Sequence, residues 1–372
     1  MQNLPLQFSE KIIFALRSLY NRYGYSQFRM GKFEEYDLYA RNKDFLISDS
    51  VLTFMDQGGK LMALKPDVTL SIVKNSKDAP GVQKLYYNEN VYRVAKGSRS
   101  FREMMQVGLE LLGDVDDYCI SEVLTLAAES LATVSRDSVL DVSHMGLLSE
   151  ILDYAQVPNE GRSEVLKVIG EKNLHGLEEA CRSLNLAEEA ISLLKQVVTC
   201  CGDVKVVLPR LRSLLDGKVG AAALDQLDNV LLALSETGLQ TQLRFDFSVV
   251  NDSRYYNGIV FKGYVAGLPS AVLSGGQYDS LMKRLNRRSG AIGFAVYMDV
   301  VEQLPRPGRE YDVDAVLLYE SGTALKDINQ AVKNLNGQGL SVLVQRRVPE
   351  NIKYKKLLKI QGKEVTVLET DA

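Results

Sequence analysis

A long stretch of helical texture, set between two stretches of strand texture, constrains the fold of this chain more than any other feature. Residues 149–239 are rich in Leu, Ala, Glu and Lys at helical spacing, as in AEEAISLLKQVV. On both sides, short apolar runs are punctuated by Gly, Pro and Asn, the pattern of strands and turns. The sequence therefore predicts one sheet-containing domain, residues 1–148 and 240–304, interrupted by a helical insertion at 149–239.

Length and composition place the chain in the ordinary globular class. It has 372 residues, of which 46% are hydrophobic and 24% charged, so several folding units are expected. The formal net charge of −3 gives no broad positive field, and binding to nucleic acid would need a local basic patch. We therefore expect no nucleic-acid partner.

The numbers and spacing of histidines and cysteines limit which metal sites and which cellular compartment are possible. His144 and His175 are the only histidines, which excludes a multi-histidine metal centre, and each is expected at the surface or at a helix end. Four cysteines without CxxC spacing favour free thiols in a reducing compartment. With no apolar run of membrane-spanning length and no leader pattern, we expect a cytoplasmic protein without metal, cofactor or membrane.

Local patterns predict the elements of the sheet-containing domain. Apolar residues at intervals of three and four predict a helix that opens the fold at Phe8–Tyr23, with Gly24 as its left-handed stop. A second helix is expected at 118–134. Strands are expected at 26–28, 52–55, 61–64, 83–87, 90–94, 104–111, 242–247, 258–264 and 271–273, with a strand leading into a helix over 289–300.

The last part of the chain predicts a separate, small α/β unit. Pro305, Pro307 and Gly308 form a linker, and the pattern of residues 311–372 then predicts strand, helix, strand and strand with a short helix before the last strand. A basic run from Arg346 to Lys359 could contact RNA or could be a solvated helix face.

A strand, a basic loop and a returning strand lie between Tyr92 and Gly113. The first strand ends at Arg93, whose planar guanidinium suits bidentate binding of a carboxylate or phosphate. On the returning strand, alternation places Gln106 and Glu110 on one face. The same residues also fit an exposed basic hairpin whose polar side chains face water, and periodicity alone leaves both interpretations open.

Two further segments combine polar groups with tight turns. Asp67 and Thr69 follow Pro66, and this pair suits either an ammonium group or an ordinary helix cap. Tyr256, before Gly258, and Tyr278, after two glycines, offer flat faces with hydroxyl groups. Both tyrosines could equally be core aromatics beside turns.

Taken in order, these segments resemble the signatures of histidine–tRNA ligases over residues 5–304. The stretch around Arg93 is similar to motif 2 of class II aminoacyl-tRNA synthetases, and the segment of Asp67 resembles that family's Leu-Arg-Pro-Glu-Gly-Thr. The resemblance implies an α+β fold with an antiparallel sheet flanked by helices. It also implies a histidine-binding pocket made of Asp67, Thr69, Arg93, Gln106, Glu110, Tyr255, Tyr256 and Tyr278.

Three departures from the family pattern concern ATP. Asn251 stands where the family has a catalytic arginine, with Arg254 displaced from that position, and Val300 stands where motif 3 has its arginine. Tyr297 replaces a glycine that leaves room for adenine. Because fixed cations stabilise the charge that develops on the phosphates, we expect no catalytic residue and no ligase activity.

A histidine-ligase body without the ATP arginines resembles the regulatory subunits of ATP phosphoribosyltransferases. The resemblance implies a short-form catalytic partner subunit, a part in the first step of histidine biosynthesis, and allosteric feedback with histidine as effector. It also implies a homodimer within a hetero-oligomer, although Gly31 replaces the proline of motif 1. Residues 311–372 resemble a truncated anticodon-binding domain.

Two further functions remain open from the sequence. A divergent histidine–tRNA ligase would need Arg254 or another cation to bind ATP, and it would exchange pyrophosphate with ATP and histidine. A synthetase-like module that senses tRNA or another amino acid would form a salt-sensitive tRNA complex.

Overall fold

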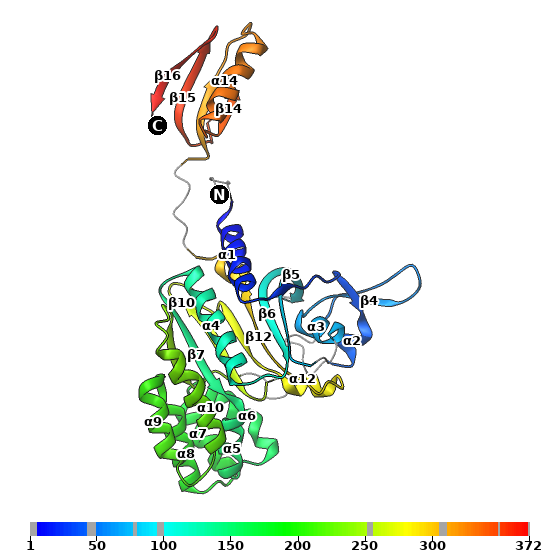
Figure 1. Cartoon of the computed structure of the whole chain (residues 1–372), viewed down its shortest axis with the longest axis vertical. Helices are drawn as coiled ribbons and strands as arrows, with labels where there is room; N and C mark the ends of the chain where they lie inside the picture. The colour runs from blue at the N-terminus through cyan, green and yellow to red at the C-terminus, as the bar shows by residue number, and fades with distance from the viewer. Residues whose placement is uncertain are drawn as a thin grey trace. The chain divides into compact units, whose positions relative to one another are not determined.

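The computed structural model describes residues 6–42, 50–76, 80–94, 100–250, 256–304, 311–348 and 350–370. The chain divides into two compact units, residues 1–304 and 305–372 (Figure 1). Each unit is built around its own sheet. Whether 149–239 forms a domain separate from the rest of the first unit stays a prediction.

A nine-stranded sheet is the centre of the first unit. Neighbouring strands are antiparallel, except that β1 runs parallel to β5 and β7 parallel to β9. The predicted, largely antiparallel α+β architecture is therefore confirmed. In spatial order the strands are β1 (Ser26–Gln27), β5 (Val82–Val94), β6 (Phe101–Gly113), β12 (Gly290–Tyr297), β11 (Leu273–Gln277), β10 (Ile259–Val265), β7 (Ser138–His144), β9 (Gln242–Asp246) and β8 (Cys201–Asp203).

Two long helices cover one face of this sheet. Helices α1 (Phe8–Arg22) and α4 (Asp117–Val134) lie side by side across it (Figure 1). The buried residues of α1, such as Leu16, pack with Leu109 of β6 and Phe294 of β12 in the main core. Gly24, at φ +83°, follows α1, so the predicted opening helix and its glycine stop are confirmed.

The opposite face carries shorter elements and a second core. Helix α3 (Thr69–Asn75) and helix α12 (Asp279–Arg284) contribute Leu70 and Leu281, which pack with Tyr87 of β5. Side chains alternate between the two faces of a strand, so β5 and β6 supply both cores. Near α3 lie α2 (Tyr36–Ala40) and a small sheet of order β2 (Phe33–Glu35), β4 (Leu61–Leu64), β3 (Thr53–Met55).

The predicted helical stretch follows β7 and precedes β9. It holds α5 (Met145–Tyr154), α6 (Asn159–Gly170), α7 (Leu174–Ser183), α8 (Glu188–Thr199), α9 (Val204–Leu215), α10 (Ala221–Leu227), the π-helix η2 (Asp228–Leu232) and α11 (Ala233–Ser235). The short strand β8 interrupts these helices and extends the sheet beyond β9. The sequence did not predict this strand.

Two strand boundaries differ from the sequence prediction. Asn88 was expected to separate two strands, but β5 runs through it because Asn88 pairs with Val107 in an unbroken ladder with β6. Strand β11 begins at Leu273, where the prediction ended, because it continues through Gly276 between β10 and β12. In both places, pairing with neighbouring strands outweighs the turn propensity of Asn and Gly.

The second unit is a four-stranded sheet with one helix. Its order is β14 (Val342–Gln345), β13 (Val313–Leu318), β15 (Tyr354–Gln361), β16 (Glu364–Thr370), and α14 (Leu325–Gly337) packs against it. The predicted short helix before β16 is wrong, because that segment forms β15, which pairs with β13 on one side and β16 on the other. The basic run therefore ends on a strand rather than on a helix face.

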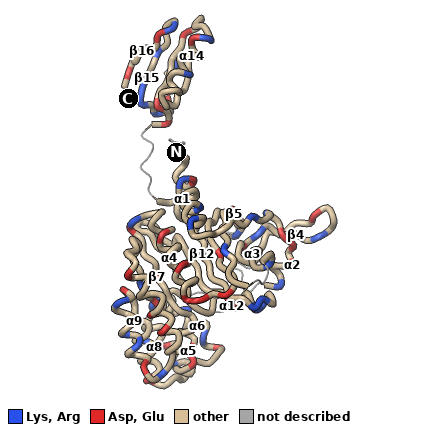
Figure 2. Tube along the Cα trace, in the orientation of Figure 1, with Lys and Arg blue, Asp and Glu red and all other residues tan. Residues whose placement is uncertain are grey.

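Charged residues are interspersed along both units (Figure 2). All four cysteines are free, and only Cys201 is exposed, as expected for structural thiols. His144 is the N-cap of α5, and His175 lies in the first turn of α7, so both are at helix ends. Among the described residues, no helix is both long and apolar enough to cross a membrane.

Candidate functional site

The centre of the candidate site is a buried carboxyl group on β6. Glu110 is 2% exposed, and both of its oxygens accept hydrogen bonds from hydroxyl groups. Thr69 at the start of α3 donates to Oε1 at 2.8 Å, and Tyr278, the N-cap residue of α12, donates to Oε2 at 2.5 Å. Glu110 therefore joins two helices to the middle of the sheet.

Glycines on the neighbouring strands make room for this group. Gly293 of β12 lies in register with Glu110, and a Cβ there would come within 1.8 Å of Oε2. Next to it, Gly276 of β11 faces Tyr256, whose Cδ1 would be 2.7 Å from an added Cβ. Gly276, the second of the two glycines singled out in the sequence, thus permits close approach of a tyrosine ring on this face of the sheet.

Burial changes the acid–base behaviour of Glu110. Loss of solvation raises its pKa from the ordinary 4.5 to about 8, the nearby carboxyl of Asp67 adds to the rise, and the two hydroxyl donors oppose it. Within the described residues, no lysine, arginine or histidine forms an ion pair with Glu110. The site therefore holds a carboxyl group that is largely protonated at neutral pH.

A second carboxyl group beside the first is paired with arginine. Asp67 Oδ2 lies 3.3 Å from Nη2 of Arg93, whose Nε donates to the Pro66 carbonyl at 2.5 Å. The other oxygen of Asp67 accepts from the Leu70 amide at 2.9 Å, in the first turn of α3. Burial raises the pKa of Asp67, while Arg93 and the amide donors lower it. Asp67 therefore both caps a helix and presents charge to the site.

Tyrosines surround these two carboxyl groups. Tyr87 of β5 and Tyr278 are buried, whereas Tyr256 is half-buried. Burial raises the pKa of Tyr256 well above 10, and the nearby Tyr297, Glu110 and Asp67 raise it further. A cluster of phenol rings beside two carboxyl groups suits a flat ring that carries N–H donors.

Gln106 completes one row of polar side chains on this face. It is 4% exposed and lies in register with Glu89 on β5 and Tyr297 on β12. Glu89 also forms an ion pair with Lys65, whose side chain is fully buried. Lys65 and Glu89 were not predicted from the sequence. Lys65 stands two residues before Asp67, but a lysine before proline carries no signal of burial.

The structure brings most of the predicted pocket residues together. Tyr255 lies outside the described residues, as do Asn251 and Arg254. The interpretation of Gln106 and Glu110 as water-facing groups of a hairpin is wrong, because both are buried. Asp67 does cap α3 and Tyr278 does belong to the second core, and neither of these roles excludes a contact with a ligand.

The two described residues that depart from the family's ATP pattern lie in different surroundings. Tyr297 is on the site face, where Ser274 and Arg93 lower its pKa and burial raises it more strongly. It lies in register with Gln106 of β6, two residues after Ala295, so its side chain is on the face that carries Glu110. Val300, in α13 (Met298–Val301), packs against the main core instead, where it offers no polar group.

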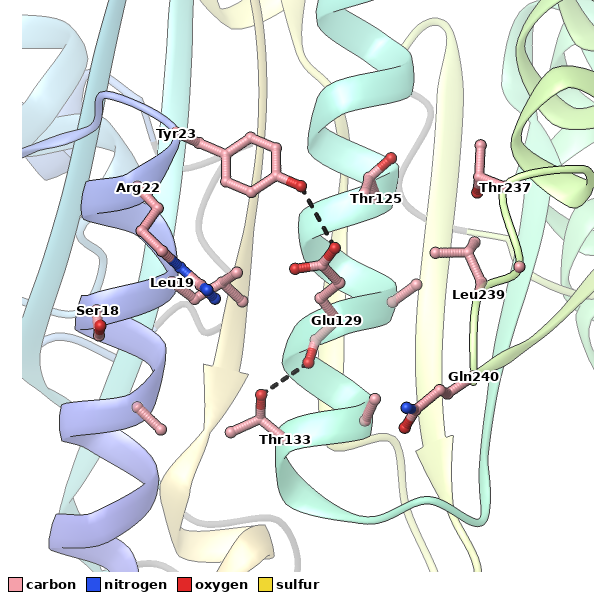
Figure 3. Close-up of a pocket in the computed structure, with 14 residues that line it drawn as sticks. Ser18, Leu19, Arg22, Tyr23, Thr125, Glu129, Thr133, Thr237, Leu239 and Gln240 are labelled. Carbon is pink, nitrogen blue, oxygen red and sulfur yellow. Dashed lines mark hydrogen bonds between the residues drawn. The ribbon is translucent and has the colours of Figure 1, made fainter.

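The other face of the sheet carries a groove of about 820 Å³ between α1, α4 and residues 237–240 (Figure 3). Most of its lining side chains are small or hydroxylated. Arg22 and Glu129 add charge to the groove, and Tyr23 donates to Glu129 at 3.3 Å. None of the predicted pocket residues lines this groove. The cluster around Glu110 therefore remains the candidate site.

Comparison with known proteins agrees with the fold and with the resemblance. The family model for histidyl-tRNA synthetase matches residues 6–301. A curated ATP phosphoribosyltransferase regulatory subunit from Caldanaerobacter subterraneus subsp. tengcongensis is 29% identical over 301 residues, which are 79% of this chain and 78% of the relative.

Solved structures show the same architecture. An ATP phosphoribosyltransferase regulatory subunit/histidyl-tRNA synthetase from Bacillus halodurans C has a TM-score of 0.75 and 26% identity, with 91% of this chain and 88% of that chain covered. A chain of the ATP phosphoribosyl transferase (HisG:HisZ) complex from Thermotoga maritima has a TM-score of 0.63 and 19% identity, with 79% and 98% covered; this last likeness concerns the fold alone. The predicted class II synthetase fold is confirmed, and the chain belongs to the histidyl-tRNA synthetase family.

Proposed function

We propose that this chain is the regulatory subunit of an ATP phosphoribosyltransferase, acting in the first step of histidine biosynthesis. The observation that carries the proposal is the buried carboxyl group of Glu110, which accepts hydrogen bonds from Thr69 and Tyr278 on a sheet of the histidyl-tRNA synthetase family. Tyr297 lies in register with Gln106 on the neighbouring strand. The curated relatives bear the name of such subunits. A catalytic partner subunit would perform the transfer of phosphoribose to ATP.

Histidine is the effector in this proposal. Glu110, with Tyr256 and Tyr278, takes the imidazole ring, because a carboxyl group between phenol rings suits a ring that carries N–H donors. Asp67 and Thr69 take the ammonium group, and Gln106 supports them from the next row of the sheet. Tyr255, by its place beside Tyr256, is part of the same proposal.

Arg93 takes the histidine carboxylate. Its guanidinium is 3.3 Å from Asp67, and an incoming ammonium group would compete with it for that carboxylate. Exchange of partners would free the guanidinium fork for the carboxylate of the same ligand. Arg93 would thereby take over from the family arginine in whose place this chain has Asn251.

The subunit is non-catalytic in this proposal. ATP activation needs cations aimed at the phosphates. Val300, which by the family resemblance stands at the position of the motif 3 arginine, packs against the main core and offers no cation. A homodimer within a hetero-oligomer and a cytoplasmic location also belong to the proposal. Three buried free thiols support a reducing compartment.

The test is phosphoribosyltransferase turnover by a short catalytic subunit from the same organism, with and without this chain, across a histidine titration. We expect stimulation on mixing and inhibition by histidine that weakens for Glu110→Gln. Glu129→Gln is the matched control, since Glu129 also accepts from a tyrosine hydroxyl but lies in the groove of Figure 3.

Three outcomes would contradict the proposal in different ways. No change in turnover and no co-elution would remove the regulatory role. Pyrophosphate exchange with ATP and histidine would make the chain a ligase. Equal histidine inhibition for Glu110→Gln and for the control would keep the role but move the effector site elsewhere.

A further inference from the structure

Helices α3 and α12 connect the candidate site to the surface. Both begin at Glu110, through Thr69 and Tyr278. Their buried residues, which include Ile72 and Met282, belong to one core. The two helices therefore contribute to the same core and share Glu110 as a polar partner at the pocket end.

One arginine joins the same helices at their other ends. Helix α12 is followed by Asn286 at φ +58°, and the chain then turns back so that the Arg287 amide donates to the Met282 carbonyl at 2.8 Å. The Arg287 Nη2 donates to the Ser76 carbonyl at 2.6 Å and lies 3.4 Å from the Lys74 carbonyl. Arg287 thus closes the carbonyl end of α3 with a charge of the favourable sign.

The surface around this junction is basic. We call it the basic junction and define it as Arg41, Lys74, Lys283, Arg284 and Arg288. Figure 2 shows the concentration of basic residues at the end of α12. Arg284 Nη2 donates to the Arg41 carbonyl at 3.2 Å, which brings α2 and α12 together at the surface.

Not all of these charges are neutralised by the chain itself. Arg41 pairs with Asp37 at 3.0 Å and Lys74 with Glu34 at 2.9 Å. Lys283 and Arg288 are exposed and form no ion pair within the described parts of the chain. The junction therefore presents a local positive field on a chain whose net charge is −3.

We propose that the basic junction is a docking surface for an acidic face of the catalytic partner protein, and that docking there is coupled to occupancy of the pocket through α3 and α12. This inference rests on the proposed function. Docking adds contacts at the Arg287 end, and the ligand changes the partners of Thr69 and Tyr278 at the other end. By reciprocity, each event changes the affinity of the other by the same factor.

A protein fits this surface better than a nucleic acid. Affinity for a phosphate backbone comes from the cations that neutralise its charges. In the basic junction Arg41 and Lys74 are already paired with carboxylates, and the net negative charge of the chain would repel a long polyanion. A small patch of rim charges instead accelerates and orients docking to a complementary protein face.

The first experiment measures partner affinity and association rate for the double variant Lys283→Glu/Arg288→Glu. We expect the dissociation constant to rise at least tenfold, mainly through slower association, and its salt dependence to decrease. Histidine affinity of the isolated chain should stay within twofold. Lys167→Glu/Lys205→Glu, two exposed lysines of the helical stretch, changes the net charge equally and should leave partner affinity unchanged.

Unchanged partner affinity in the junction variant would contradict the proposal that the basic junction is a docking surface. Loss of binding to a bulk tRNA probe, with partner affinity intact, would overturn it in favour of nucleic acid. If the unmodified chain binds no catalytic subunit, the proposed function fails first, and this result is distinct from a failure confined to the variant.

The second experiment tests the coupling. Partner affinity is measured with and without saturating histidine for the unmodified chain and for Arg287→Lys, which keeps the charge but loses the guanidinium fork. We expect the ratio of the two affinities to move toward one in the variant, with histidine still bound and the melting temperature checked alongside. An unchanged ratio would show that Arg287 does not link partner docking to histidine binding, and it would contradict the proposed coupling.

Discussion

The hydroxyl of Tyr278 donates a 2.5 Å hydrogen bond to Glu110 Oε2, and the two residues are 168 positions apart in the chain. This bond joins the N-terminus of α12 to the middle strand of the site, across the whole helical stretch in sequence. Because the carboxyl group is buried, its protonation state affects both the stability of the fold and the binding of a ligand.

Because the pKa of Glu110 is raised, we expect the free energy of unfolding to fall as the pH rises. Its pKa is about 8 in the folded chain and 4.5 in an exposed carboxyl group, so between these values the folded state binds more protons than the unfolded state. The contribution of Glu110 is fully present below about pH 4.5 and is lost as the pH passes 8, with a slope of at most about 1.4 kcal/mol per pH unit.

Denaturant midpoints at pH 6 and pH 9 measure this effect. We expect Glu110→Gln to lose less stability over that interval than the unmodified chain, and Glu129→Gln to behave like the unmodified chain. The same pH dependence in all three proteins would show that Glu110 is not the responsible group.

At Gly293 we expect a single added methyl group to reduce both stability and histidine binding. In Gly293→Ala the new Cβ would lie 1.8 Å from Glu110 Oε2 and 2.5 Å from the Leu109 carbonyl, so β12 or Glu110 must move. Overpacking of this kind costs about 1–3 kcal/mol, and histidine binding should be lost or greatly weakened.

Gly337→Ala is the matched control for this substitution. Gly337 ends α14 with a φ outside the left-handed region, and an added Cβ would meet nothing within 4 Å, so we expect stability to be unchanged or slightly raised. Thermal melting and calorimetric titration with histidine check both variants. Full histidine affinity in Gly293→Ala would contradict the close packing at Glu110.

We expect the start of the helical stretch to lose stability in acid because His144 is buried as a neutral ring. Its Nδ1 accepts from the Leu147 amide at 2.9 Å, and its Nε2 faces Gln226 Oε1 at 3.1 Å. Burial lowers the pKa of His144 below 6.5, although Gln226 opposes the shift. The stability contributed by the neutral ring is therefore present above pH 6.5 and is lost as the pH falls below it.

Two substitutions distinguish the helix-capping role of His144 from the effect of protonating its ring. His144→Asn keeps an N-cap acceptor and should flatten the stability profile between pH 5 and 7.5, whereas His144→Ala should cost about 1 kcal/mol at pH 7.5. Urea midpoints across this range measure both effects. A profile in His144→Asn as steep as that of the unmodified chain would place the acid sensitivity elsewhere.

We expect the stability of the helical stretch to depend on the ion pair between Lys172 and Asp246. The carboxylate of Asp246 in β9 is 1% exposed and pairs with Lys172, which follows α6 at φ +53°. Lys172→Met would leave a buried carboxylate without its cation, and we expect a loss of about 1–3 kcal/mol. Adding Asp246→Asn should recover part of this loss in denaturant unfolding, and a purely additive double variant would contradict the coupling.

The sequence determined which local elements form and which polar side chains share a face. Alternation placed Gln106 and Glu110 together on β6, and apolar spacing defined α1 and α4, because both depend on neighbours within one element. The family signatures also selected the class II fold before any contact was known. Between 346 and 363 local pattern failed, since β15 is fixed by pairing with β13 and β16 rather than by its own periodicity.

Only the tertiary structure decided what the polar residues do with one another. The pairing of Arg93 with Asp67, the burial of Lys65 against Glu89 and the closure of α3 by Arg287 all join separate segments. The raised pKa of Glu110 depends on packing by β12, α3 and α12 together. Sequence spacing sets the order of such groups, but desolvation and charge pairing depend on distances through space, which only the folded chain sets.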